Sequence, residues 1–153
     1  MPFTGLELDW QQILDNLGRL TIAYVLALPI GWDRERAERS AGLRTFPLVG
    51  LATCGYMLVA IYTLETSEAE ARAFLGVVTG MGFIGGGAIL KERSRVLGTA
   101  TAASLWNTGA IGVAVAFSRF EIAIILSLLN FLTLNLLTKR LKKHVGAELQ
   151  DEE

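Results

Sequence analysis

Charged residues that could bind a cation or pair with one another are concentrated in one polar segment, residues 33–45, which reads DRERAERSAGLRT. Its acidic and basic residues recur at the spacings of ion pairs on one helix surface. Asp33 and Glu35 carry carboxylate oxygens, which hard divalent cations prefer as ligands, so these two are the metal ligands to name if any metal binds. With the next basic segment, this stretch supplies one candidate cluster: Asp33, Arg34, Glu35, Arg36, Arg44, Thr45 and Glu92.

Two interpretations of this cluster stay open. In the first, it is a functional site, and the expected contacts are the pairs Asp33–Arg36, Glu35–Arg39 and Arg44–Glu92. In the second, the basic residues hold the loops on one side of a membrane and contact anionic lipids.

Glycines gather in the middle of the chain, within residues 75–106. In a water-soluble helix each costs about 1 kcal/mol against alanine, whereas in a bilayer small residues let helix backbones approach closely. At 100° per residue they fall on two faces, which predicts the central helix of a bundle, packed from two sides. Carbonyl groups in a broken helix would instead offer an ion path, but close packing is favoured. The residues are Gly80, Gly82, Gly85, Gly86 and Gly87.

Polar side chains follow in the next apolar segment. They would either bond neighbouring helices together or line a hydrated cleft, and the first role is favoured. The set comprises Thr99, Thr101, Ser104, Asn107 and Thr108. Asn130 and Asn135 in the last apolar segment are costly against lipid, so we expect each to face another helix or another subunit.

Arg19 is the clear charge inside an apolar segment. It either faces the interior of a bundle or extends to the membrane surface, and the two are equally favoured. If it is buried, its expected partners are carbonyl groups at a helix end or polar groups of the fourth apolar segment. No acidic partner is obvious from the sequence.

The elements that position these residues are membrane helices. The 153 residues are 52% hydrophobic, and the apolar residues form blocks near the span length of about 20. The fold class is therefore an all-α, polytopic membrane helix bundle with five transmembrane helices. An interfacial segment (residues 1–16) precedes the membrane domain (17–138), and a cytoplasmic tail (139–153) follows it. The predicted spans are residues 17–32, 46–64, 71–90, 98–117 and 120–138.

Basic residues near the span ends predict the orientation. The segment after the first span has four, the segment after the third has three, and residues 139–143 have four. The opposite side has only Arg72 and Arg119. The N-terminus is therefore predicted outside and the C-terminus in the cytoplasm.

Four motifs in order carry a family resemblance: residues 30–36 (IGWDRER), 41–45 (AGLRT), 80–88 (GMGFIGGGA) and 98–106 (GTATAASLW). They resemble successive motifs of the MgtC/SapB family over about residues 17–137, with Asp33 where that family usually has Glu. The chain resembles a short form that lacks the soluble C-terminal domain of longer members. The resemblance implies a bacterial inner-membrane protein linked to magnesium homeostasis and intracellular survival, which regulates other membrane proteins such as the ATP synthase.

Other function classes find little support. His144 lies in the tail and Cys54 inside an apolar block, so no catalytic dyad is expected and the chain is not read as an enzyme. The net charge of −1 and the membrane-flanking positions of the basic residues argue against nucleic-acid binding. We expect no cofactor apart from Mg²⁺ itself, the lipid bilayer as surroundings, and a homo-oligomer. The leading hypothesis is regulatory binding within the membrane, and the alternative is a magnesium channel or carrier.

Overall fold

The computed structural model describes residues 9–37, 41–92 and 95–137. Five α-helices follow one another, with a two-stranded hairpin between the third and fourth and a π-helical turn after the fifth. Their bounds are α1 (Trp10–Arg36), α2 (Thr45–Thr63), α3 (Ser67–Gly87), β1 (Leu90–Glu92), β2 (Arg95–Leu97), α4 (Thr99–Ala116), α5 (Phe120–Leu132) and η1 (Thr133–Leu137).

Polar side chains cap the N-terminal ends of two helices, α1 and α3. The carboxylate of Asp9 accepts the backbone N–H groups of Gln11 and Gln12 at 3.0 and 3.2 Å, so α1 begins at Trp10. The hydroxyl of Thr66 accepts the N–H of Ala69 at 3.2 Å at the start of α3. Both are N-caps, which satisfy N–H groups that have no partner within the helix.

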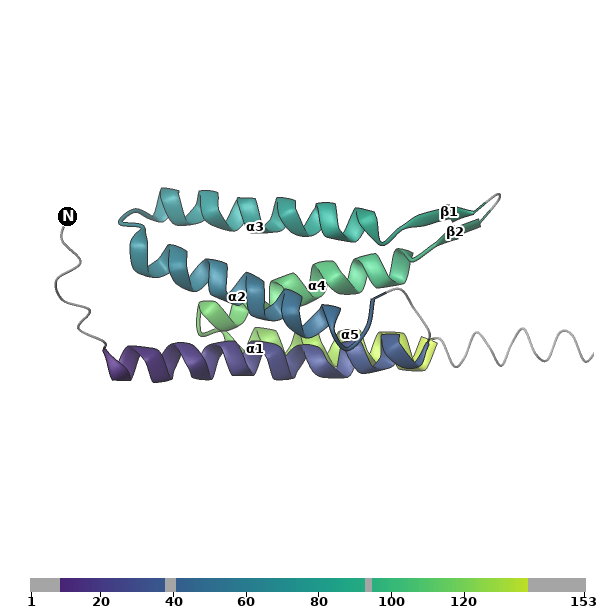
Figure 1. Cartoon of the computed structure of the whole chain (residues 1–153), viewed down its shortest axis with the longest axis horizontal. Helices are drawn as coiled ribbons and strands as arrows, with labels where there is room; N and C mark the ends of the chain where they lie inside the picture. The colour runs from purple at the N-terminus through teal and green to yellow at the C-terminus, as the bar shows by residue number, and fades with distance from the viewer. Residues whose placement is uncertain (1–8, 38–40, 93–94, 138–153) are drawn as a thin grey trace, which may run out of the picture.

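The helices alternate in direction, as Figure 1 shows: α1, α3 and α5 run one way, and α2 and α4 run the other. The C-terminal ends of α1 and α3, the hairpin and the N-terminal ends of α2 and α4 therefore lie at one end of the bundle. That end carries the basic residues Arg34, Arg36, Arg44, Lys91 and Arg95.

The helices occupy the predicted spans, with differences at their ends. Helix α1 starts within the predicted interfacial segment and continues to Arg36 as one helix, with Pro29 inside it. The basic segment after α3 is a hairpin in which Leu90 pairs with Leu97, a structure the sequence analysis did not predict. The predicted tail lies outside the described residues.

The central helix is α4, which packs against α1, α2, α3 and α5. The prediction that the glycine-rich helix is central is wrong, because α3 lies at the edge of the bundle against α4 and α2 (Figure 1). A Cβ atom added to Gly80, Gly82, Gly86 or Gly87 would meet nothing within 4 Å in this chain. Small residues permit close packing, but a helix needs a matching partner surface to use them.

The close packing occurs at other glycines. A Cβ at Gly112 in α4 would collide with the hydroxyl of Thr53 and the carbonyl oxygen of Gly50, both in α2. A Cβ at Gly50 would lie 3.1 Å from the carbonyl oxygen of Ala23 in α1. These two glycines let α1, α2 and α4 approach almost to backbone contact.

Within the described residues, α1 and α2 are long and apolar enough to cross a membrane, and α5 is a shorter apolar helix. Large apolar side chains also cover the outer surface. Phe83 is 86% exposed, and Tyr56 and Trp10 are 69% and 68% exposed. A surface of this kind fits lipid, and it supports a membrane location for the chain.

Candidate functional site

Among the described residues Arg34 is the buried charge; it lies near the C-terminal end of α1 and is 4% exposed. Its Nη2 and Nε atoms donate to Oδ2 of Asp33 at 2.6 and 3.2 Å. A buried guanidinium needs a carboxylate partner, because removing it from water costs several kcal/mol. The predicted pair of Asp33 with Arg36 is wrong, since Asp33 bonds to Arg34. Arg36 instead lies over the ring of Trp32, 5.2 Å from its centroid.

The loop after α1 folds back onto the same helix end. Oε2 of Glu35 accepts the backbone N–H of Leu43 at 3.1 Å and lies directly against Gly42. A Cβ at Gly31 would lie 3.2 Å from the carbonyl oxygen of Gly42, so the two glycines permit this contact. Both glycines lie within the family motifs, but no contact between them was predicted.

The same loop also bonds to the first turn of α2. The carbonyl oxygen of Gly42 accepts the N–H groups of Thr45 and Phe46 at 3.0 and 3.1 Å. Arg44 is left exposed at the start of the helix, with Thr45 half-buried beside it. Residue 39 and the side chain of Glu92 lie outside the described residues, and so do the contacts predicted for them.

Arg19 joins α1 to the C-terminal end of α4. Its Nη1 donates to the carbonyl oxygen of Ala116 at 2.9 Å and to the hydroxyl of Ser118 at 2.6 Å. The predicted carbonyl group at a helix end is thus its partner. An acidic partner also exists, which the sequence analysis did not find: Nε donates to Oδ2 of Asp15 at 2.8 Å. The two residues are four apart on α1, and that spacing was the available signal.

The polar residues of α4 bond to α5. The hydroxyl of Ser104 lies 3.0 Å from Oδ1 of Asn130, and Nδ2 of Asn107 donates to the carbonyl oxygen of Leu126 at 3.3 Å. Thr108 donates to the carbonyl oxygen of Ser104 at 2.8 Å. Thr101 is buried, and Thr99 is exposed at the start of the helix. The bonds of Ser104 and Asn107 thus join α4 to α5, whereas that of Thr108 stays within α4.

Ser127 was missed by the sequence analysis. Its hydroxyl donates to the carbonyl oxygen of Leu26 at 2.6 Å and so joins α5 to α1. The available signal was the serine itself, because a polar side chain within an apolar block is costly against lipid and is expected to face another helix.

Two of the glycine carbonyl groups considered for an ion path already have partners. The oxygens of Gly85 and Gly86 accept the N–H groups of Ala88 and Ile89 at 3.1 Å each. Helix α3 stays helical through Gly87, and a Cβ at Gly85 would lie 3.4 Å from the carbonyl oxygen of Ala102 in α4. Gly85 is thus the member of the glycine set that packs against another helix.

Among the described residues, no group of three or more His, Cys, Asp or Glu side chains is placed to hold a metal ion. Of the two carboxylates named as metal ligands, Oδ2 of Asp33 bonds to Arg34 and Oε2 of Glu35 accepts the N–H of Leu43.

Comparisons with known proteins give one consistent result. A model of the MgtC family matches residues 20–143. "Uncharacterized protein slr0014" of Synechocystis is 36% identical over 122 residues, covering 80% of this chain and 50% of that protein. "Putative magnesium transporter YhiD" of Escherichia coli K12 is 35% identical, covering 76% of this chain and 57% of that protein. "Protein MgtC" of Salmonella typhimurium LT2 is 35% identical, covering 69% and 45%. The chain thus spans about half the length of these relatives, and no solved structure matches it.

Proposed function

The chain belongs to the MgtC family, and we propose that it is a multi-pass protein of the bacterial cytoplasmic membrane which serves magnesium homeostasis by binding other membrane proteins. In this proposal all five helices cross the bilayer, the N-terminus lies outside, and the basic end of the bundle faces the cytoplasm. The alternating directions of the helices and the arginines at one end support that orientation.

The proposed binding surface is the outer face of α3. Gly82 and Gly86, four residues apart, are exposed, and a Cβ at either would meet nothing within 4 Å. Leu75 lies on the same helix face and is 63% exposed. Two glycines at this spacing let the backbone of a second transmembrane helix approach closely. This face is turned away from the rest of the bundle, so a helix of another membrane protein or of a second copy has access to it.

The hydrogen bonds of the oxygen atoms that could bind an ion favour protein binding over ion transport. One oxygen of each of the Asp33 and Glu35 carboxylates, the carbonyl oxygens of Gly85 and Gly86 and the hydroxyl of Ser104 already bond within the chain. An ion at these groups would compete with hydrogen bonds that stabilise the bundle.

A magnesium channel or carrier is the second candidate, favoured by the name of the relative from E. coli. Purified protein in proteoliposomes distinguishes the two. We expect no Mg²⁺ flux above that of empty vesicles. Selective, saturable flux that Asp33→Asn or Glu35→Gln abolishes would replace the binding proposal with transport.

A photoreactive amino acid at position 75 tests binding directly in magnesium-limited cells. We expect it to form crosslinks to a membrane protein, whereas the same group at Leu129, an exposed position on α5, should not. Gly82→Leu should remove the crosslink by filling the glycine face. Equal crosslinking from both positions, or no effect of Gly82→Leu, would contradict the use of this face.

A further inference from the structure

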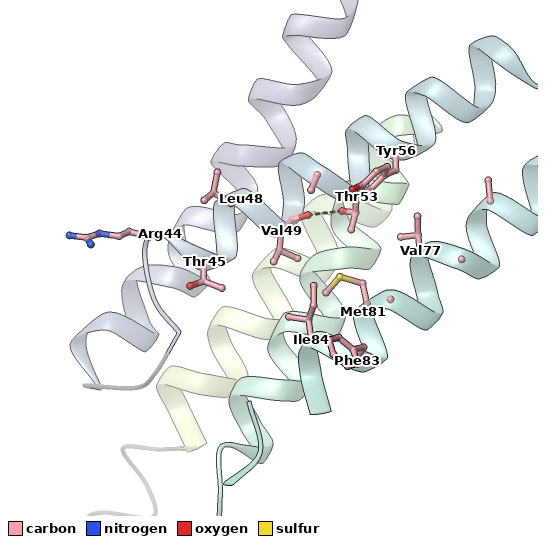
Figure 2. Close-up of a pocket in the computed structure, with 14 residues that line it drawn as sticks. Arg44, Thr45, Leu48, Val49, Thr53, Tyr56, Val77, Met81, Phe83 and Ile84 are labelled. Carbon is pink, nitrogen blue, oxygen red and sulfur yellow. Dashed lines mark hydrogen bonds between the residues drawn. The ribbon is translucent and has the colours of Figure 1, made fainter. Parts of the chain in front are cut away.

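A groove of about 850 Å³ runs between α2 and α3, on a different side of α3 from Gly82 and Gly86. Figure 2 shows its lining, with Arg44 and Thr45 at one end and Tyr56 toward the other. Between them the lining is apolar, with side chains such as Leu48, Val77 and Ile84.

Two features keep the groove open and apolar. Gly76 and Gly80 of α3 line it, and a Cβ at either would meet nothing within 4 Å, so no side chain from α3 fills the space there. Thr53 of α2 also lines it, but its hydroxyl bonds to the carbonyl oxygens of Val49 and Gly50 at 3.0 and 3.2 Å. Its polar group is therefore satisfied within its own helix, and the groove presents hydrocarbon.

The length of the groove fits one leaflet of a bilayer. From Arg44 to Tyr56 helix α2 rises about 18 Å, at about 1.5 Å per residue. One leaflet contributes half of a hydrocarbon core of about 30 Å, and a spanning helix needs its full thickness. A groove of this length therefore fits a lipid chain better than a transmembrane helix of a partner.

Arg44 carries the only charge among the described residues that line the groove. It is exposed, and in Figure 2 its guanidinium extends away from the helices at the end of the apolar lining. A lipid whose acyl chain lies in the groove would have its headgroup at this end, where a guanidinium can bind phosphate through two parallel N–H groups.

We propose that the α2–α3 groove binds an acidic phospholipid, with an acyl chain along Gly76 and Gly80 and the phosphate at Arg44. The hydroxyl of Thr45 lies at the same end as a second donor. This inference rests on the membrane location proposed above, but it does not depend on the partner protein or on the outer face of α3.

A second groove provides the internal control. It has a volume of about 720 Å³, lies beside α3, α4 and α5, and also carries an arginine, Arg119. There Nε of Arg119 lies 3.7 Å from Oε1 of Glu121, so a carboxylate within the chain already offsets its charge. The electrostatic attraction for an acidic headgroup is therefore weaker at this site.

The first experiment measures lipid retained by protein purified from bacterial membranes in mild detergent, using native mass spectrometry with added phosphatidylglycerol or phosphatidylcholine. The wild-type protein should retain phosphatidylglycerol in preference. Arg44→Ala should lower that retention about fivefold, which corresponds to about 1 kcal/mol for one basic residue at a lipid surface. Arg44→Lys should restore part of it, and Arg119→Ala should leave it unchanged. Equal losses in the two alanine variants would overturn the proposal, as would equal retention of the two lipids.

The second experiment tests the acyl chain with two variants on one helix. Gly80→Leu puts a side chain into the groove, whereas Gly82→Leu puts one on the outer face of α3, and neither meets other atoms of the chain at its Cβ. Gly80→Leu alone should lower retention of phosphatidylglycerol. Equal effects of the two variants would overturn the groove as the site.

A protein occupant would give a different result. If the wild-type protein retains a second copy of itself in place of lipid, and Gly80→Leu loses that copy, the lipid proposal is overturned. A loss of partner crosslinks in Gly82→Leu bears only on the proposed function.

Discussion

The guanidinium of Arg34 lies 2.6 Å from the carboxylate of Asp33, its neighbour in the chain. Adjacent residues on a helix point about 100° apart and do not normally face each other. The pair forms near the end of α1, where Arg34 is buried. One residue thus places a positive charge inside the bundle, and its neighbour supplies the negative charge that keeps it there.

Asp33→Ala should therefore destabilise the protein strongly. It leaves a buried guanidinium without its carboxylate, which costs about 3–5 kcal/mol. The control is Glu68→Ala, which breaks the exposed pair with Arg72, also 2.6 Å long. An exposed pair contributes about 0–1 kcal/mol. Thermal unfolding in detergent, followed by circular dichroism, should show a large drop in midpoint for Asp33→Ala alone. Equal midpoints for the two variants would mean that burial of Arg34 does not matter.

Gly112→Ala should disturb the contact between α4 and α2. The new Cβ would collide with the hydroxyl of Thr53 and the carbonyl oxygen of Gly50. Because these atoms lie on a packed helix, the helices must move apart, at a cost of about 1–3 kcal/mol. Gly86→Ala is the control, since its Cβ meets nothing within 4 Å, and it should be neutral or stabilising by up to about 1 kcal/mol. A Gly86→Ala variant less stable than Gly112→Ala would contradict the placement of α4 at the centre.

The sequence predicted the existence of each helix because each contains a long apolar block between charged segments, but the ends of α1 differ by several residues. The blocks at residues 46–64 and 120–138 correspond to α2 and to α5 with its π-helical turn, within a residue or so at each end. Family membership was predicted from four short motifs and is confirmed by the comparisons. Both predictions rest on local patterns, which a single chain displays directly.

Which helix faces which could not be predicted in the same way. The spacing of Asp33 and Arg36 predicted an ion pair, but burial of Arg34 decided which arginine takes the carboxylate. The number of glycines in α3 suggested a central helix, yet Gly112 in α4 makes the closest contact between two helices. Both outcomes depend on the surface of another helix, which is distant in the sequence.

Arg19→Met should loosen the junction of α1 with the end of α4. The variant keeps an apolar side chain of similar length and removes the bonds to the carbonyl oxygen of Ala116 and the hydroxyl of Ser118. Hydrogen bonds of charged groups contribute about 1.5–3 kcal/mol, and partial exposure of this one lowers the expected loss toward the bottom of that range. Arg119→Met, at an exposed pair, should change the unfolding midpoint little. A wild-type midpoint for Arg19→Met would show that the arginine is satisfied equally well by water or lipid.

Ser118→Gly should have opposite effects in the presence and absence of Arg19. The residue has φ of 59°, a left-handed conformation that favours glycine, and relief of that strain is worth about 1 kcal/mol. In the wild-type chain the substitution also removes the hydroxyl that Nη1 of Arg19 contacts at 2.6 Å, so the two effects offset each other. In the Arg19→Met background only the relief remains, and Ser118→Gly should raise the unfolding midpoint. The difference between the two backgrounds is the coupling energy of the pair. The same change in midpoint in both backgrounds would mean that the bond between Arg19 and Ser118 adds nothing to stability.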